Sequence, residues 1–398
     1  MGKRIVYFSF PASGHVNPTL PVIRELVARG EQISYYSTAS FARAVEQTGA
    51  EFCSYTRRMR MPATGPGPFA QLTTTLETLL DFSGAVLDDH LAAVRRLRPT
   101  HVMFDSFAPW GRMVAQLLAL PSVGSVPSIL INEAIDARYG SAPGRPVEDP
   151  RLTAEWCAGF RWRCQARLRG YRLPGLPSPP ELLQTYGDIN LVYTSRRFQP
   201  MAEQFDARRF RFVGPCCSFR PDAPPFPFEQ LDGRPLVLVS LGTAYGQPDF
   251  LRKCQWELAG APWQVIVAAG GDSTLPADAP DNAIVRAWVP QLEILRRASA
   301  FVTHGGMNSV QEALFYRVPV VLVPQAADQF WIASRTVELG AGMMLDSARF
   351  SPGEIRSKVA AVISTPRYAS AAAGIAQSLH AAGGAIKAAE EIRKFFGT

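Results

Sequence analysis

The stretch 288–329 gathers residue types that suit a ligand carrying phosphate groups. A predicted strand ends near Thr303, two glycines follow at 305 and 306, and a helix begins near Asn308 or Ser309. Glycines let the main chain approach a ligand closely, and the start of a helix offers N–H groups and a positive dipole to phosphate oxygens. His304 adds an imidazole donor at the same place. The pattern predicts a phosphate site at this helix start.

Other side chains in this stretch suit the remaining parts of a sugar nucleotide. Trp288 has a flat apolar face for stacking a base, and Gln291 has an amide for ribose or base. Glu312, about one turn into the helix, is a poor neighbour for phosphate but a good acceptor for sugar hydroxyls. Asp328 and Gln329 offer the acceptors and donors that hold a hexose. Taken singly, each residue is weak evidence, because packing, capping or a tight turn can explain it and Trp288 alone would most often belong to the core. The prediction therefore depends on their order and spacing.

The elements that position these residues begin with a βαβ unit. A buried strand at 4–10 precedes a loop, a helix at about 18–29 and a second strand at 33–37. Asn17 suits the start of this helix and Gly30 its end. Such a unit indicates a parallel sheet, which further apolar segments at 101–104, 122–126 and 190–193 extend.

A second cycle of strands follows a proline-rich segment, which predicts two domains. The expected boundaries are 1–217 for an N-terminal domain, 218–235 for a linker and 236–383 for a C-terminal domain that carries the predicted phosphate site. A helix at about 384–398 is expected to pack back on the first domain. The predicted fold is α/β, with two doubly wound Rossmann-like domains facing across a cleft at the carboxyl ends of their strands.

The segment 288–329 closely resembles the donor-binding signature of UDP-glycosyltransferases with the two-domain GT-B fold. The wording Thr-His-Gly-Gly-Met-Asn-Ser at 303–309 is most similar to bacterial macrolide and flavonoid glycosyltransferases, and the resemblance covers almost the whole chain. Segment 239–243 resembles the first loop of the family's C-terminal domain. The resemblance implies that Trp288 stacks on uracil. The donor-binding residues that it implies are Thr243, Trp288, Val289, Gln291, His304, Gly306, Asn308, Ser309, Glu312, Asp328 and Gln329.

Within that set the resemblance assigns a part of the donor to each group of residues. Gln291 and Glu312 bind ribose. The diphosphate is held by His304, Asn308 and Ser309, with Thr243 nearby. Asp328 and Gln329 bind the sugar. Plant members usually carry Trp where this chain has Met307, so the sugar contact known there is not carried over.

The loop 10–18 resembles the family segment that carries the catalytic histidine, here His15. Asp105, which ends the strand predicted at 101–104, resembles the aspartate that pairs with it. Neutral imidazole can take the proton of an acceptor hydroxyl near neutral pH, and a carboxylate fixes its tautomer and stabilises the imidazolium. A lone loop histidine is more often a solvated or capping residue, and the aspartate has similar alternatives. The implied reaction is inverting transfer of a hexose, with UDP-glucose as the expected donor and a dTDP-deoxysugar as the alternative.

The acceptor is expected to be a small, apolar, hydroxylated compound such as a macrolide, polyketide or flavonoid. Phe82, Phe107 and Trp110 are the candidate acceptor-binding residues, although such rings can equally belong to the core. No Asp-x-Asp motif is present to hold a divalent ion on the diphosphate. No metal and no cofactor are therefore predicted, and protein groups must stabilise the departing charge.

Composition limits the other classes of function. With 398 residues, 47% of them hydrophobic, the chain suits a globular protein of two domains. No apolar run approaches the roughly 20 residues of a membrane span, and no signal peptide is recognised, so we expect a cytoplasmic protein. The six cysteines show no disulfide or metal spacing. The net charge of +7 falls in 1–217, with 25 Lys and Arg against 18 Asp and Glu.

Solvated helix faces explain this basic excess best, with an acidic acceptor or a membrane surface as the alternatives. Nucleic-acid binding is not predicted, because the arginine clusters lack interleaved aromatic residues. Two other functions stay open: a sugar-nucleotide epimerase of the same architecture, and a catalytically silent partner of another transferase. A nicotinamide dehydrogenase fits less well, because no GxGxxG follows the first strand. The sequence does not decide between a monomer and a homodimer.

Overall fold

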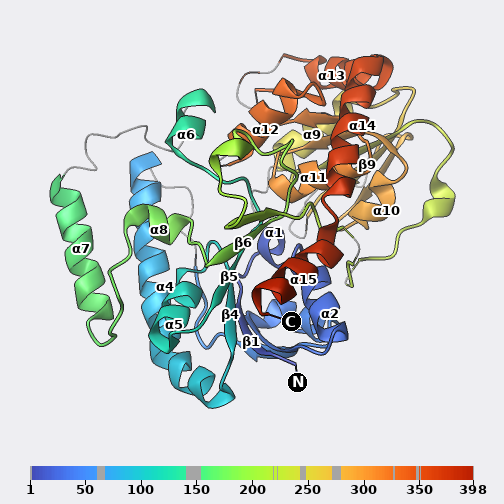
Figure 1. The fold of residues 1–398 in the computed structure, drawn as a ribbon. Coiled ribbons are helices and arrows are strands. Elements are labelled where there is room, and N and C mark those ends of the chain that lie inside the picture. The colour runs from blue at the N-terminus through green and yellow to red at the C-terminus, as the bar shows by residue number, and fades with distance from the viewer. Residues whose placement is uncertain are drawn as a thin grey trace. The chain divides into compact units, whose positions relative to one another are not determined.

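The computed structural model divides into two compact units (Figure 1). The first comprises Met1–Tyr193, Met201–Pro221 and Gly383–Thr398, and the second comprises Thr194–Pro200 and Asp222–Ala382. Segment 194–200, expected in the first domain, thus belongs with the second. The structure describes residues 2–60, 68–139, 154–217, 219–221, 223–242, 248–270, 279–325, 328–346, 349 and 351–397.

The first unit is built on a parallel sheet of strand order β3-β2-β1-β4-β5-β6-β7. Each strand pairs in parallel with its neighbours, and β1 lies centrally between β2 and β4. The carboxyl ends of β1 and β4 therefore meet at one edge of the sheet. The strands are β1 (Arg4–Phe8), β2 (Gln32–Ser37), β3 (Glu51–Ser54), β4 (His101–Asp105), β5 (Ser122–Val126), β6 (Ile189–Val192) and β7 (Phe210–Phe212).

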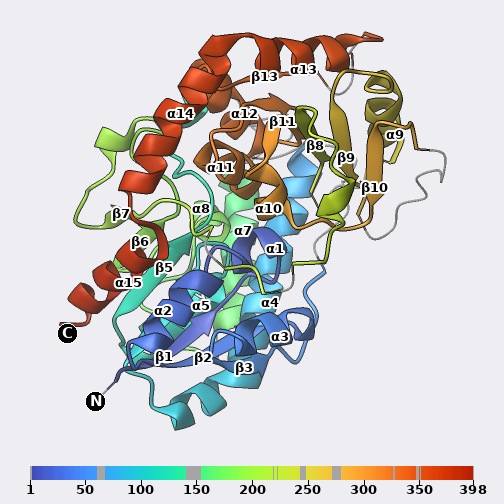
Figure 2. The same ribbon diagram turned by 90° about the vertical axis from the view of Figure 1, so that its right-hand side faces the viewer.

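Helices cover both faces of this sheet (Figures 1 and 2). Alternate side chains of β1 enter opposite cores: Ile5 and Tyr7 lie in a cluster with α2 and α15, whereas Val6 and Phe8 lie in one with α4 and α5. Burial on both faces explains the continuous apolar run of this strand. The helices are α1 (Ser13–Val16), α2 (Leu20–Ala28), α3 (Ala42–Glu46), α4 (Pro68–Leu97), α5 (Pro109–Leu118), α6 (Glu133–Tyr139), α7 (Ala154–Leu168), α8 (Pro179–Leu183) and α15 (Gly384–Phe395), with short 3₁₀ turns η1 (Ala39–Phe41) and η2 (Ala202–Gln204).

The second unit has its own parallel sheet, of order β10-β9-β8-β11-β12-β13. The strands are β8 (Leu236–Ser240), β9 (Gln264–Ala268), β10 (Ala283–Arg286), β11 (Ala298–Thr303), β12 (Val320–Leu322) and β13 (Gly342–Met344). The helices are α9 (Pro248–Glu257), α10 (Gln291–Leu295), α11 (Met307–Phe315), α12 (Gln329–Glu338), α13 (Glu354–Ser364) and α14 (Pro366–Ala381), with the turn η3 (Phe228–Gln230). Both units thus have the parallel Rossmann-like architecture that the sequence predicts.

Helix α15 follows α14 in the chain but packs in the first unit. Its buried face, which includes Ala388 and Ile392, lies in the core cluster that also contains α2. Both views show α2 and α15 side by side (Figures 1 and 2). The ring of Phe396, just beyond the helix, lies 3.8 Å from that of His101.

The local structure differs from the sequence prediction around His15. The stretch before α2, expected to be a loop, contains the single helical turn α1, and α2 begins at Leu20 after Thr19 instead of at Pro18. Main-chain bonds from the N–H groups of His15 and Val16 to the carbonyl of Ala12 close this turn. The turn gives His15 a fixed main-chain position.

Candidate active site

His15 and Asp105 form a side-chain pair in the first unit. Asp105 is the last residue of β4, and His15 lies in α1, just after β1. Imidazole Nδ1 lies 2.9 Å from Asp105 Oδ1 and 3.0 Å from Oδ2. The Asp105 side chain is 0% exposed and that of His15 is 20% exposed. A buried carboxylate thus holds an imidazole that reaches the surface.

Main-chain and ring contacts fix the orientation of this pair. The main-chain N–H of Phe107 donates to Asp105 Oδ1 over 2.8 Å. The ring centroids of Phe10 and Phe107 lie 4.7 and 5.1 Å from that of His15. Because Nδ1 faces the carboxylate, the imidazole has Nε2 available to take a proton. This geometry suits a general base.

The three candidate acceptor-binding rings lie in different surroundings. Phe107 is half-buried beside His15. Trp110 is 0% exposed and Phe82 is 6% exposed, and their ring centroids lie 4.9 Å apart within the core. In this structure Phe107 alone of the three has appreciable surface for a ligand, whereas Trp110 and Phe82 belong to the buried core cluster against which Phe107 packs. Acceptor binding by these rings stays a prediction.

In the second unit, the segment after β11 has the geometry of an anion site. Thr303 ends the strand, Gly305 has a φ of +84°, and Gly306 is the N-cap of α11. A positive φ is rarely adopted by other residues, which accounts for the first glycine. The second glycine, Gly306, has no side chain that could accept hydrogen bonds from the first N–H groups of the helix, so these groups can donate to a ligand. Asn308 and Ser309 lie half-buried in the first turn.

His304 lies against two glycines that leave room for its ring. A Cβ on Gly306 would lie 2.3 Å from imidazole Nε2, and one on Gly242, in the loop after β8, would lie 2.7 Å from Cε1. Burial lowers the pKa of His304 to about 4. The imidazole is therefore neutral at pH 7, so it offers a ligand one N–H and no charge.

Gln291 and Glu312 are joined by a hydrogen bond in the second unit. The amide Nε2 of Gln291, at the start of α10, donates to Glu312 Oε2 over 2.6 Å. Glu312 is buried on α11, so this bond sets the direction of a carboxylate with little room to move. Trp288 precedes them and is 53% exposed, whereas Val289 is half-buried. An exposed indole face is available for a planar ligand.

The remaining donor candidates lie around the start of α12. Asp328 is its N-cap, and Gln329 is buried in its first turn. The main-chain N–H of Gln325 donates to Gln329 Oε1 over 2.9 Å, which fixes this amide. Thr243 lies outside the described residues. Sugar and phosphate contacts of these residues stay predictions.

Two findings concern other classes of site. Within the described ranges, no three His, Cys, Asp or Glu side chains converge so that they could hold a metal ion. In the same part of the chain, no helix is long and apolar enough to cross a bilayer.

Known proteins match this chain over nearly its full length. It is 32% identical to an uncharacterized UDP-glucosyltransferase of Bacillus subtilis strain 168, an alignment that covers 98% of this chain and 96% of the relative. The oleandomycin glycosyltransferase of Streptomyces antibioticus is also 32% identical, with 98% and 90% covered. The chain belongs to the bacterial macrolide-type UDP-glycosyltransferases.

The fold of this glycosyltransferase agrees with that assignment. The solved structure of the kitacinnamycin glycosyltransferase matches it with a TM-score of 0.82 at 32% identity, covering 99% of this chain and 98% of that one. A calicheamicin glycosyltransferase gives the same TM-score at 28% identity, with 100% and 98% covered. Residues 259–392 match the model of the erythromycin biosynthesis protein CIII-like C-terminal domain. The GT-B family assignment predicted from sequence is confirmed, and the chain is a glycosyltransferase enzyme.

Sequence reasoning missed two residues around the pair of His15 and Asp105 in this glycosyltransferase. Phe10 was noted only as part of a motif, yet its ring contacts that of His15. Tyr55 was not noted at all, although its hydroxyl is hydrogen-bonded to the main chain at Ser9. The motif does not single out Phe10 and does not include Tyr55, but an aromatic residue next to the loop that carries His15 is a signal that can be searched for.

Proposed function

We propose that this glycosyltransferase moves glucose from UDP-glucose to a hydroxyl of a small apolar natural product, with inversion at the anomeric carbon. His15 is the general base and Asp105 its partner. The observation that carries this proposal is the contact of Nδ1 with both oxygens of a fully buried carboxylate. A histidine that merely capped a turn would have no need of that partner.

On the acceptor side, the buried carboxylate orients the imidazole and stabilises it once protonated. Nδ1–H donates to Asp105, so the lone pair of Nε2 takes the acceptor's proton as its oxygen attacks the anomeric carbon. The bond from that carbon to the diphosphate oxygen breaks as the new one forms. An α-linked donor then gives a β-glycoside.

On the donor side, the leaving diphosphate is bound by groups of the second unit. The first N–H groups of α11, the N–H of neutral His304 and the side chains of Asn308 and Ser309 stabilise its negative charge without a metal ion. The hydrogen-bonded carboxylate of Glu312 accepts from ribose hydroxyls. The exposed indole of Trp288 stacks on uracil.

The acceptor class is inferred from relatives and from the surroundings of His15. The similar proteins include an oleandomycin glycosyltransferase and a 4'-demethylrebeccamycin synthase. Phe10 and Phe107 flank the imidazole with apolar rings, which favours an acceptor whose hydroxyl sits on an apolar skeleton.

The first experiment is incubation with UDP-glucose and a panel of macrolides and phenols, with mass spectrometry as the readout. Gain of one hexose on an acceptor supports the proposal. A changed sugar nucleotide without such a product would indicate an epimerase instead. Calorimetric competition between UDP-glucose and dTDP-deoxysugars then tests the donor, and tighter binding of a deoxysugar would refute our choice.

The variant His15→Ala tests the base. We expect turnover to fall by about 100-fold or more, the usual contribution of general base catalysis, while UDP binds nearly as in the wild type. His380→Ala, which removes an imidazole from the exposed end of α14, is the matched control. Wild-type turnover in His15→Ala would remove this residue from the mechanism.

A further inference from the structure

Tyr55, the residue after β3, carries a buried hydroxyl that links two loops. It accepts a hydrogen bond from Trp110 Nε1 over 2.9 Å and donates one to the carbonyl oxygen of Ser9 over 2.8 Å. Both side chains are almost fully buried, with Trp110 at 0% and Tyr55 at 6% exposed. The hydroxyl is therefore an internal polar link that water cannot easily replace.

The two ends of this link lead to the two residues of the catalytic pair. Ser9 follows β1 and precedes Phe10, whose ring contacts His15. Trp110 lies in the first turn of α5, five residues after Asp105. Tyr55 thus joins the segment that carries the base to the segment that carries its partner.

Main-chain hydrogen bonds connect the Tyr55 hydroxyl to the segment that carries His15 and to the segment that carries Asp105. The N–H of Ser9 donates to the carbonyl of Tyr36 on β2, and the carbonyl of Ser9 accepts from the Tyr55 hydroxyl. Both main-chain polar groups of Ser9 are therefore hydrogen-bonded. On the second segment, the N–H of Ala108 donates to the carbonyl of Asp105 over 2.8 Å. A short, hydrogen-bonded turn therefore connects the buried indole to the carboxylate.

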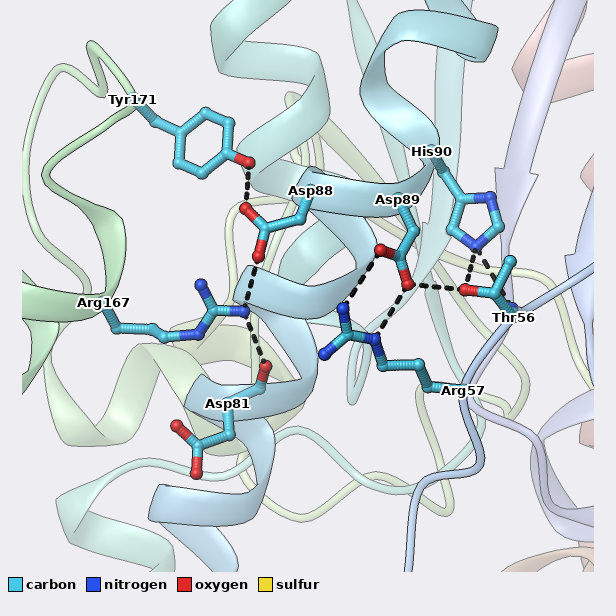
Figure 3. A network of polar contacts seen from close by, with 8 residues as sticks. All are labelled: Thr56, Arg57, Asp81, Asp88, Asp89, His90, Arg167 and Tyr171. Carbon is cyan, nitrogen blue, oxygen red and sulfur yellow. Dashed lines mark hydrogen bonds and ion pairs between the residues drawn. The ribbon is translucent and has the colours of Figure 1, made fainter.

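The two residues that follow Tyr55, Thr56 and Arg57, are hydrogen-bonded to side chains of α4 (Figure 3). The main-chain N–H of Thr56 donates to His90 Nε2 over 3.3 Å, and its hydroxyl donates to Asp89 Oδ2 over 2.6 Å. Arg57 binds the same carboxylate through Nε and a terminal nitrogen. These contacts hold segment 55–57 on α4, a long helix that provides a rigid support.

The hydroxyl is present in its donating form throughout the working pH range. Burial raises the pKa of Tyr55 well above its ordinary value, and the indole of Trp110 opposes this only in part. A protonated phenol has one O–H to donate and lone pairs to accept, which matches its two partners. Tyr55→Phe keeps the ring and removes both bonds.

We propose that Tyr55 is a positioning residue for the transfer: its hydroxyl ties the main chain at Ser9 to the Trp110 indole and thereby aligns His15 with Asp105. The catalytic part of this inference rests on the proposed function. The structural part, that the hydroxyl controls the placement of the imidazole, does not. Trp110, which the sequence offers as a candidate acceptor-binding residue, is in this proposal the hydrogen-bond donor to Tyr55.

The test compares Tyr55→Phe with Tyr186→Phe. Tyr186 also has a hydroxyl hydrogen-bonded inside the first unit, to Gln184 Oε1, but it packs in a separate cluster with Phe210. With UDP-glucose and the panel acceptor that gains a hexose most rapidly, we expect kcat to fall about tenfold in Tyr55→Phe, as expected for loss of alignment worth one hydrogen bond. The KM for UDP-glucose should stay within about twofold, because the predicted donor residues belong to the second unit.

Nuclear magnetic resonance of the imidazole rings tests the placement without any substrate. The chain has five histidines, so ring-labelled protein gives a simple spectrum in which His15→Ala identifies the His15 signals. Tyr55→Phe should shift them, while His304 and His380 keep their positions and Tyr186→Phe changes none of the three. His15 signals at wild-type positions in folded Tyr55→Phe would overturn the proposal.

A second variant covers the case in which Tyr55→Phe does not fold. Trp110→Phe removes the indole N–H but leaves the bond from Tyr55 to Ser9, so we expect a smaller shift of the His15 signals and a smaller fall in kcat. If the two singles fold, the double variant should be no slower than Tyr55→Phe, because both act through one link. Additive losses would contradict that link. If no acceptor in the panel reacts, the proposed function fails and the imidazole spectra still decide this inference.

Discussion

Replacement of Asp105 by Asn removes the carboxylate charge from the proposed catalytic pair of His15 and Asp105 while keeping the shape of the side chain. Asp105 accepts from His15 Nδ1 and from the N–H of Phe107, and its side chain is 0% exposed. An amide oxygen can still accept one of these bonds, but its NH₂ group then faces the other donor. The buried site thus loses both a charge and an acceptor.

The size of the effect follows from the kinds of hydrogen bond involved. A bond to a charged group contributes roughly 1.5–3 kcal/mol and a neutral one about 0.5–1.5 kcal/mol, so about 1.5 kcal/mol of stabilisation is lost when the imidazolium forms. Since about 1.4 kcal/mol corresponds to a factor of ten, turnover should fall at least about tenfold. A turned amide that selects the wrong imidazole tautomer would enlarge the loss.

The assay is initial-rate measurement with UDP-glucose and the best panel acceptor, together with calorimetric binding of UDP. The matched control is Asp188→Asn, because Asp188 also accepts from a main-chain N–H and a side chain in the first unit, both of Ser122. We expect the control to keep wild-type turnover and both variants to bind UDP normally. Turnover of Asp105→Asn within about twofold of the wild type would refute the role of this carboxylate.

Two further predictions concern His304 and His101. Gly306→Ala would place a Cβ 2.3 Å from His304 Nε2 and displace the imidazole, so calorimetry should show UDP affinity at least about tenfold lower. Gly175→Ala, where a Cβ meets no atom within 4 Å and φ lies outside the left-handed region, tests whether a new Cβ alone has this effect. Burial lowers the pKa of His101 to about 4. The unfolded chain therefore binds a proton here at higher pH than the folded one, and stability falls as pH drops from about 6.5 towards 4. In urea unfolding, the free energy of unfolding of His101→Phe should fall by up to about 2.5 kcal/mol less than that of the wild type between pH 7.5 and 4.5. An equal fall in both proteins would contradict the assignment.

The sequence predicts most of the fold because the strands are short apolar runs between turn signals. Alternating strands and helices led to two parallel sheets, and the change from strand to glycines to helix at 303–309 was located within a residue or two. Helix α1 was missed because a single turn has no periodicity to read. The placement of 194–200 with the second unit was missed because no change in composition marks it.

The contact between His15 and Asp105 was predictable only through resemblance, since ninety residues separate the two in sequence. Their contact follows from strand order, because β1 and β4 are adjacent although β2 and β3 lie between them in sequence. The link through Tyr55 could not be predicted for the same reason, because its two hydrogen-bond partners are 46 and 55 residues away in sequence. In addition, the sequence does not distinguish a buried tyrosine whose hydroxyl links two segments from any other core residue. The sequence also could not predict that Trp110 is buried, because an aromatic residue near a site can either pack in the core or contact a ligand.

The position of α15 bears on how the chain is synthesised. This helix covers α2 with a buried face that includes Ala389 and Ile392, yet the ribosome makes it only after the entire second unit. The nascent first unit therefore has an uncovered apolar surface during most of translation, the situation in which incomplete domains aggregate or recruit chaperones. We therefore expect the first unit to reach its full stability only once α15 has been synthesised and has packed on α2.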